Sequence, residues 1–307
     1  MIVVREADPE TQDLKGFFQL FGEGVTASGE ELPPGWVEER IDSIRNKQEY
    51  CYVAMEADET KGVIVFSQKG GRGFAFVSWR KDGIDREGLL LLVREYVNRM
   101  NSVSWMRISG IHPNVPDEVM TSVCESLGFQ RRCRMEMSRA LSDIPEFPPP
   151  EGRFGFIPIT DFSEGTLSKL DFEGYRGTPD EGLFADSVAE YEGMMHSLLT
   201  GDYGPVIKDA SVCAVVEGNP VAMIAVTDMG ENAFVADLVI SEPYRRKGIA
   251  RYLLSNAMKS AAQLKKKEIT LWVSEENSSA LSLYKSVGFT EVRKGAYYAR
   301  RLREPVR

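Results

Sequence analysis

The chain has 307 residues, and a typical domain length of ~150 residues suggests about two domains. Hydrophobic residues make up 43% and charged residues 27% of the chain, which is typical of a soluble globular protein with real cores. The net charge of −9 gives the chain as a whole no electrostatic reason to bind nucleic acid or an anionic membrane. A local basic stretch is therefore more informative here than in a basic protein.

Cysteine and histidine usage argues against a disulfide framework and against a metal centre. No CxxC spacing occurs among the four cysteines, Cys51, Cys124, Cys133 and Cys213. They are expected to be reduced intracellular thiols. The chain has only two histidines, so we expect no metal site.

The N-terminal stretch MIVVREADPE turns acidic after four residues and does not resemble a signal peptide. No uninterrupted apolar run approaches the ~20 residues that a membrane-spanning helix needs. A cytoplasmic protein without a membrane partner is therefore the expectation.

A proline-rich stretch lies near the middle of the chain. Residues 142–152, SDIPEFPPPEG, carry four prolines and few residues that could be buried. This composition favours a stiff linker between a domain over 1–141 and a domain over 153–307. A surface loop within one domain is the alternative reading.

The two halves resemble each other, which predicts two copies of one fold. Residues 124–129, CESLGF, match residues 284–289, YKSVGF, at an offset of 160 positions. The same offset pairs Gly88 with Gly248 and sets one apolar, helix-like run against another. Several coincidences at one offset, in elements of the same type, are hard to obtain by chance.

The second half has the more readable order of elements. Apolar runs and alternation predict strands over residues 211–216, 221–228, 233–240 and 268–274. Helical spacing predicts helices over 249–263 and 278–287, the latter closed by Gly288. A strand, helix, strand crossover requires a partly parallel sheet, so the fold class is α/β with a mixed sheet flanked by helices in each of two tandem domains.

The stretch EPYRRKGIARYLLSNAM, residues 242–258, lies at a junction between a strand and a helix. A helix N-terminus offers unpaired N–H groups and a partial positive charge, and Gly248 would let those groups approach a ligand closely. Arg245, Arg246 and Lys247 add three full charges. Together these are the ingredients of a pyrophosphate site. From these residues alone, a basic turn that merely follows a strand is equally plausible.

The pattern Arg245-x-x-Gly248-x-Ala250 resembles the acyl-CoA loop of GCN5-related N-acetyltransferases. Downstream, Asn277, Ala280 and Tyr284, followed by Gly-Phe at 288–289, resemble the second signature of that family. The resemblance covers about residues 213–298. It implies an acetyl-CoA-dependent acetyltransferase with the corresponding α/β fold.

The resemblance also implies a role for each matching residue. The pyrophosphate of acetyl-CoA would be received by the loop and the first helical turn, formed by Arg245, Arg246, Lys247, Gly248, Ile249 and Ala250. Strand 233–240 would splay from its neighbour, so that backbone groups of Leu238 or Ile240 pair with the acetyl carbonyl and pantetheine. Asn277 would hydrogen-bond the pantetheine arm, and the hydroxyl of Tyr284 would point at the sulfur.

Acetyl transfer to an amine needs a proton acceptor for the amine and a donor for the leaving thiolate. A tyrosine hydroxyl, with a pKa of about 10, is a reasonable donor, which favours Tyr284 as the acid. Asp237 is the candidate base, although an acid that faces solvent is an equally good reading. Trp272 stands where relatives that acetylate protein N-termini often have glutamate, whereas Tyr297 and Tyr298 are similar to their peptide-contacting tyrosines.

The first half lacks two of the three loop cations and the tyrosine of the second half at the positions 160 residues earlier in the chain. Asp85 and Glu87 stand where the second half has cations, and Cys124 stands opposite Tyr284. Carboxylates near a helix N-terminus compete with phosphate for the same amides. We therefore predict that the first half is a degenerate copy that does not bind acetyl-CoA.

These patterns predict that residues 153–307 transfer acetyl from acetyl-CoA to an amine of a small molecule by direct attack. A protein N-terminal or lysine acetyltransferase, with a peptide acceptor, is the alternative within enzymes. A CoA-binding sensor or scaffold without turnover is the alternative from a different class. No nucleic-acid partner is expected.

Overall fold

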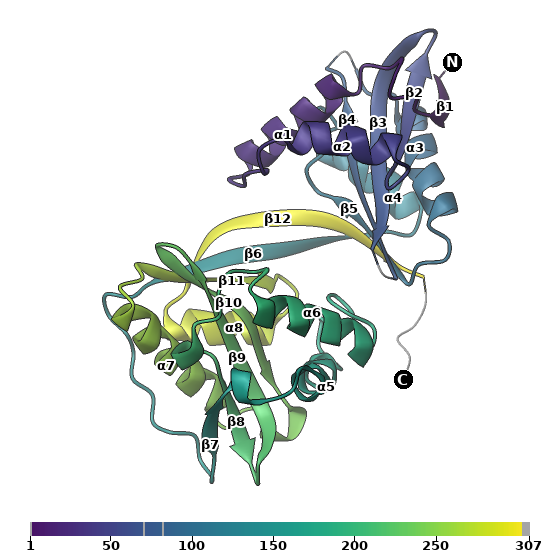
Figure 1. The fold of residues 1–307 in the computed structure, drawn as a ribbon. Coiled ribbons are helices and arrows are strands. Elements are labelled where there is room, and N and C mark those ends of the chain that lie inside the picture. The colour runs from purple at the N-terminus through teal and green to yellow at the C-terminus, as the bar shows by residue number, and fades with distance from the viewer. Residues whose placement is uncertain (1, 70, 82, 303–307) are drawn as a thin grey trace. The chain divides into compact units, whose positions relative to one another are not determined.

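The computed structural model describes residues 2–69, 71–81 and 83–302. They form two units (Figure 1). Unit 1 comprises Met1–Cys133 and the stretch that begins at Gly295, and unit 2 comprises Arg134–Lys294. The tandem architecture predicted from the internal repeat is confirmed.

Two long strands make this division differ from the predicted boundaries at 141 and 153. Strand β6 (Gln130–Ala140) leaves unit 1 and pairs antiparallel with β11 (Glu268–Ser274) in unit 2. Strand β12 (Thr290–Arg301) leaves unit 2 and pairs antiparallel with β5 (Trp105–Ser109) in unit 1. Each half of the chain therefore supplies a strand to the sheet of the other unit.

The proline-rich stretch 142–152 lies within unit 2 and joins β6 to β7 (Gly155–Pro158). Its Pro145 carbonyl accepts a hydrogen bond from Ser255 Oγ at 2.6 Å. Glu146 pairs with Lys259 at 2.8 Å. Both partners belong to helix α7 (Ile249–Gln263). The stretch is thus a loop packed on one unit, which was the alternative reading, and not a linker between the units.

Unit 1 is a sheet in the order β1-β2-β3-β4-β5-β12 with helices on both faces. Alternation along the strands sends Val53 and Val63 toward α1 and α2, and Ala54 and Ile64 toward α3 and α4. The further elements are β1 (Ile2–Glu6), α1 (Lys15–Ala27), α2 (Trp36–Arg45), β2 (Tyr50–Glu56), β3 (Glu59–Lys69), β4 (Arg72–Trp79), α3 (Arg86–Arg99) and α4 (Asp117–Ser126).

Unit 2 repeats this arrangement in the order β12-β6-β11-β10-β9-β8-β7. One face packs against α5 and α6, and the other packs against α7 and α8. The further elements are α5 (Glu164–Tyr175), α6 (Val188–Thr200), β8 (Val212–Val216), β9 (Asn219–Met229), β10 (Asn232–Ile240) and α8 (Ser278–Val287), with 3-10 turns at Ile159–Asp161, Lys208–Ala210 and Glu242–Tyr244. Within the described ranges, no helix is both long and apolar enough to cross a membrane.

The sheet of unit 2 opens between its two parallel strands. Strands β10 and β11 pair only at Ala233 with Ile269 and at Phe234 with Thr270. The register of β10 against β9 shifts between Val235 and Asp237, which marks a β-bulge. Beyond Phe234, β10 therefore presents its edge to an opening, as expected for strand 233–240.

Candidate active site

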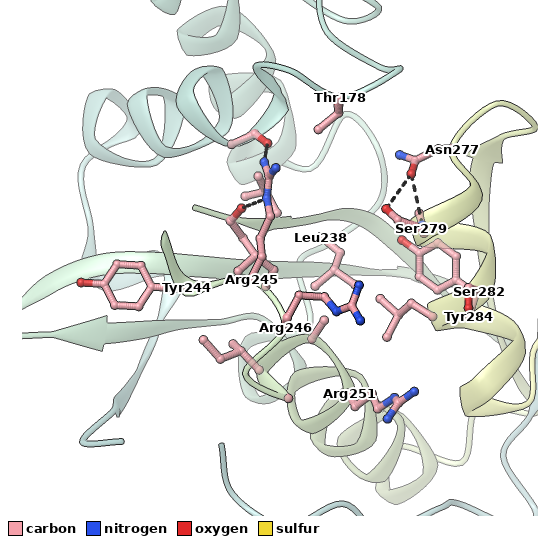
Figure 2. Close-up of a pocket in the computed structure, with 18 of the residues that line it drawn as sticks. Thr178, Leu238, Tyr244, Arg245, Arg246, Arg251, Asn277, Ser279, Ser282 and Tyr284 are labelled. Atoms are coloured by element: carbon pink, nitrogen blue, oxygen red, sulfur yellow. Dashed lines mark hydrogen bonds between the residues drawn. The ribbon is translucent and has the colours of Figure 1, made fainter. Parts of the chain in front are cut away.

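A cleft of about 600 Å³ lies in unit 2, where the edge of β10 meets the N-terminal ends of α7 and α8 (Figure 2). Nine of the predicted site residues line it: Leu238, Ile240, Arg245, Arg246, Gly248, Ile249, Ala250, Asn277 and Tyr284. Lys247 and Asp237 are not part of its wall. The structure thus brings most of the sequence-predicted residues together from three separate segments.

The loop before α7 leaves the first helical amides without a side-chain partner among the described residues. Gly248 is the N-cap residue, with φ of +84°, and no side chain of the described ranges caps the helix. A Cβ built on Gly248 would have no atom within 4 Å, so its face is open space. Arg246 also has a positive φ, of +66°. The loop therefore exposes a helix N-terminus to the cleft without an acidic residue in the first turn.

The three adjacent cations of this loop have three different environments. Arg245 donates from Nε to the Ile240 carbonyl at 3.1 Å and from Nη2 to the Gly174 carbonyl at 2.7 Å (Figure 2). The ammonium group of Lys247 lies over the Tyr244 ring at 5.1 Å. Arg246 is exposed and extends into the cleft, and its guanidinium has no partner among the described residues. Of these three cations, Arg246 is thus the one that can meet an anion there.

The edge of β10 offers backbone groups to the same cleft. The carbonyl of Ile240 points away from β9, because it accepts from Arg245. Alternate residues of a strand direct their backbone groups to the same edge. Leu238 therefore presents its C=O to the opening, whereas its N–H also hydrogen-bonds the carboxylate of Asp237 and the carbonyl of Ile240 is already engaged.

Asn277 begins α8 and is held from two sides. Its Oδ1 accepts from the Ala280 N–H at 3.1 Å and from Ser279 Oγ at 3.2 Å (Figure 2). Its Nδ2 donates to Asp180 Oδ2 at 2.7 Å. Asn277 thus lines the cleft as a helix cap, and these protein contacts use its oxygen and one of its two donors.

Tyr284 is 8% exposed, on the wall formed by α8. Within the described part of the chain, its hydroxyl has no protein hydrogen-bond partner. Burial and the carboxylates of Asp237 and Asp180 raise the pKa of Tyr284 well above its usual value. The hydroxyl therefore keeps its proton at neutral pH and can donate a hydrogen bond to a group in the cleft.

Asp237 is half-buried just after the bulge of β10. Its Oδ1 accepts a hydrogen bond from the hydroxyl of Tyr175 at 2.7 Å. Burial raises the pKa of Asp237. The carboxyl group thus stands behind Tyr175, which lines the cleft, and does not simply face solvent.

The sequence reading missed several residues of the cleft. Arg251 lies on α7, one turn beyond Gly248, and donates to Ser286 Oγ at 3.2 Å. Its position three residues after Gly248 would have predicted this face of the helix. Gly174, Tyr175 and Thr178 come from the end of α5 and the loop after it. The sequence marks the segment 174–182, which contains all three, only as a plausible acceptor-side loop or an ordinary connection. It does not place that segment against β10, because only the tertiary fold brings α5 there.

The tyrosines near the C-terminus do not belong to this site. Tyr297 and Tyr298 are 3% and 1% exposed on the part of β12 that lies in unit 1. The hydroxyl of Tyr298 hydrogen-bonds Thr121 Oγ1 at 3.0 Å. Their similarity to peptide-contacting tyrosines was therefore misleading. Trp272 lies on β11 under the guanidinium of Arg293 at 5.2 Å and is not part of the cleft wall.

Known proteins match the part of the chain that builds this cleft. The model of the "Acetyltransferase (GNAT) family" matches residues 173–289, all within unit 2. N-alpha-acetyltransferase MAK3 of Arabidopsis thaliana is 28% identical over 144 residues, which span 45% of this chain and 74% of the relative.

Solved structures are similar over nearly the whole chain. A GCN5-related N-acetyltransferase from Sphaerobacter thermophilus has a TM-score of 0.62 at 17% identity, covering 99% of this chain and 97% of the other. A tandem GNAT protein from the clavulanic acid biosynthesis pathway has a TM-score of 0.52 at 12% identity and covers 99% of both chains. At these identities the likeness concerns the fold alone. The match to the acetyltransferase (GNAT) family model thus falls on residues 173–289, the part of the chain that builds the cleft.

Proposed function

We propose that unit 2 binds acetyl-CoA and transfers its acetyl group to an amine of a small molecule by direct attack. One observation carries the proposal. The uncapped N-terminus of α7 and the guanidinium of Arg246 lie in the same cleft as the hydroxyl of Tyr284, and neither side chain has a partner among the described residues. An anion site and a hydrogen-bond donor in one cleft suit a substrate with a phosphate group and a reacting sulfur.

The residues of the cleft fit acetyl-CoA in their chemistry. The first amides of α7 and Arg246 would hold the pyrophosphate, because a helix N-terminus and a guanidinium both favour phosphate oxygens. The exposed edge of β10 at Leu238 would pair with the amide groups of pantetheine. Arg245 would act indirectly, by holding the loop in place.

Transfer requires the amine nitrogen to attack the thioester carbonyl carbon, so that a C–N bond forms and the C–S bond breaks. The acceptor enters as an ammonium ion and must first lose a proton, for which Asp237 is the proposed base. A backbone N–H at the exposed edge of β10, that of Leu238 or Ile240, would stabilise the oxyanion. The hydroxyl of Tyr284 would donate to the departing sulfur.

The test is thiol release from acetyl-CoA by the purified full chain, with a panel of polyamines, aminosugars and short peptides. Acetyl transfer to at least one amine, lost in Tyr284→Phe while acetyl-CoA still binds, is the expected result. Binding of acetyl-CoA without thiol release for any acceptor would instead identify a sensor or scaffold. Absence of acetyl-CoA binding would overturn both proposals.

A peptide acceptor is the second candidate, because the Arabidopsis relative is named as an N-alpha-acetyltransferase. Trp272 argues against it, since its position is held by glutamate in many such enzymes. The panel separates the two candidates when it includes one peptide with a free N-terminus and the same peptide with that amine blocked. Transfer to the free peptide alone would favour the second candidate.

We further propose that unit 1 does not bind acetyl-CoA. The carboxylate of Asp85 caps α3 and accepts from the N–H groups of Glu87 and Gly88 at 2.8 and 3.0 Å. At the end of β4, the backbone of Trp79 donates to the Pro113 carbonyl at 3.2 Å and accepts from Asn114 Nδ2 at 2.7 Å. The amides that a phosphate and pantetheine would need already have protein partners.

A further inference from the structure

Asp171 is a buried carboxylic acid next to the candidate base. It lies on α5, one turn before Tyr175, and is 3% exposed. Tyr175 donates to Asp237 Oδ1 at 2.7 Å, and the side chains of Asp171 and Asp237 are within hydrogen-bonding reach of each other. Two ionised carboxylates have only acceptors, so this contact requires one proton between them.

We propose that Asp171 and Asp237 form a carboxyl–carboxylate pair that shares one proton, in which Asp171 is a positioning residue that keeps Asp237 ionised to accept the proton of the acceptor ammonium. The proposal rests on the acetyl transfer proposed above. It adds a residue that no sequence motif marks and that does not line the cleft.

Among the described residues, the side chains around Asp171 and Asp237 include no cation that pairs with either carboxyl group. Tyr175 belongs to α5, Tyr191 faces it from α6, and Cys213 faces Asp171 from β8. The charge of Asp237 acts on the hydroxyl of Tyr284 in α8. The charges of Asp180, in the loop after α5, and of Arg134, in β6, act on the same hydroxyl. In the described part of the chain, no lysine, arginine or histidine forms an ion pair with either carboxyl. A second negative charge is therefore unfavourable.

Differences in exposure and hydrogen bonding decide which carboxyl group of the pair carries the proton and which carries the negative charge. Asp171 Oδ1 is buried without a partner in the described residues, whereas Asp237 is only half-buried. Burial raises the pKa of both groups, and that of Asp171 lies well above its usual value. Hydrogen bonds from Asp171, from Tyr175 and from the backbone N–H of Leu238 lower the pKa of Asp237 again. Asp171 thus carries the proton, and Asp237 carries the negative charge on the side of the pair that faces Tyr175 and the cleft.

The proton transfers then balance. The acceptor ammonium gives one proton to the pair by way of the Tyr175 hydroxyl, which lies between the cleft and Asp237. This transfer converts the pair from one negative charge to neutral and leaves a neutral amine. The amine attacks the thioester carbonyl, and the C–S bond breaks as the C–N bond forms. The second proton lost by the nitrogen reaches the thiolate through the hydroxyl of Tyr284. The pair returns its proton to solvent before the next turnover.

The first test needs no acceptor. Full chain labelled with ¹³Cγ-aspartate is titrated by NMR, as wild type, Asp171→Leu, Asp171→Asn and the control Asp202→Asn, an exposed position. We expect two coupled resonances that retain one proton through neutral pH in the wild type and in the control. Asp171→Leu should raise the pKa of Asp237, and Asp171→Asn, which keeps a donor, should largely restore it. Two independent carboxyls that titrate in the ordinary range would overturn the pair.

The second test uses an amine found in the acceptor panel. Activity requires ionised Asp237, so kcat is lost as pH falls through its pKa. Asp171→Leu should move this acid limb to higher pH, and kcat below the limb should then be about tenfold lower for every pH unit that the limb moves. KM for acetyl-CoA should be unchanged, and Asp171→Asn should move the limb back. A loss of kcat that is equal at all pH values, with the limb in place, would mean a merely structural role and would overturn the proposal.

The two tests also keep this inference separate from the proposed function. If no amine in the panel is acetylated, the NMR titration still decides whether the pair shares a proton. If acetylation occurs but the carboxyls titrate independently, only the inference about Asp171 falls.

Discussion

Arg245 Nη2 donates to the backbone carbonyl of Gly174 at 2.7 Å, which ties the loop before α7 to the end of α5. Gly174 is needed at this point, because a Cβ there would overlap Cγ2 of Val239 on β10. The close approach of α5 to β10 thus lets one arginine hold two elements of the cleft. The neighbouring Arg246 has no such contact within the described ranges and extends into the cleft.

Replacing these two arginines by alanine should therefore have different effects. Arg245→Ala removes two hydrogen bonds from a charged donor and should lower the free energy of unfolding by about 2 kcal/mol. Arg246→Ala should leave stability unchanged but weaken acetyl-CoA binding about tenfold, because a charge-assisted contact with phosphate is lost. Urea unfolding and calorimetric titration measure the two effects. Equal losses of stability in both variants would contradict the assignment.

Gly248→Ala should weaken acetyl-CoA binding more than it reduces stability. At φ of +84° an added Cβ costs about 1 kcal/mol, and it would also stand where phosphate approaches the amides. Gly218→Ala is the matched control, because Gly218 has φ of +81° and an equally open surround in the turn between β8 and β9. Thermal unfolding should shift alike in both, and only Gly248→Ala should lose affinity. Similar affinities in both variants would argue against a phosphate at Gly248.

Tyr284→Phe should lower kcat about 100-fold, the range expected for a general acid, and leave acetyl-CoA binding nearly unchanged. The pKa of Tyr284 is raised by burial and nearby carboxylates, so its hydroxyl should remain a donor into the alkaline range. The matched control is Tyr252→Phe, on α7, where the ring packs against Phe156 at 4.9 Å. Steady-state kinetics and binding titrations measure both. Wild-type kcat in Tyr284→Phe would remove the acid role.

One acetyl-CoA should bind per chain, in the wild type and after charge reversal of Asp85 and Glu87 to Arg and Lys. The reversal removes the cap of α3, which should cost about 1 kcal/mol of stability. It should not create a site, because Pro113 and Asn114 still occupy the backbone of Trp79. The number of acetyl-CoA molecules bound per chain, measured by calorimetry, should be the same in the variant as in the wild type. The rate of acetyl transfer should also be nearly unchanged. A second binding event, or a large loss of transfer, would show that unit 1 takes part.

The free energy of unfolding should fall as pH rises above about 4, partly because of Asp171. Its pKa is about 3.9 in an unfolded chain and well above the usual value in the folded protein, because it is buried. Between these two values the unfolded state releases the proton first, so this stabilisation is full below the unfolded pKa and is lost as pH rises through the folded pKa. Asp171→Asn should flatten the slope in urea unfolding, whereas Asp202→Asn should keep it. An unchanged slope in Asp171→Asn would contradict the raised pKa.

Sequence patterns located the elements of unit 2 and most of the cleft residues. The ranges predicted for the strands before and after α7 and for both helices agree with the structure to within one residue. Gly248 could be found because it stands at a junction between a strand and a helix, where a residue with positive φ favours glycine. Asn277 and Tyr284 were indicated by their resemblance to the second signature of the family. The internal repeat likewise predicted two units of one fold.

What local spacing could not decide was which distant groups meet. Arg245, Arg246 and Lys247 are equivalent cations in the sequence, and only packing against Gly174 and Tyr244 separates their roles. The exchange of β6 and β12 between the units, which buries Tyr298 in unit 1, has no local signal either. Strand pairing and the meeting of Asp171 with Asp237 depend on contacts between segments far apart in the chain. Those contacts are selected by burial in the whole fold, so no motif could reveal them.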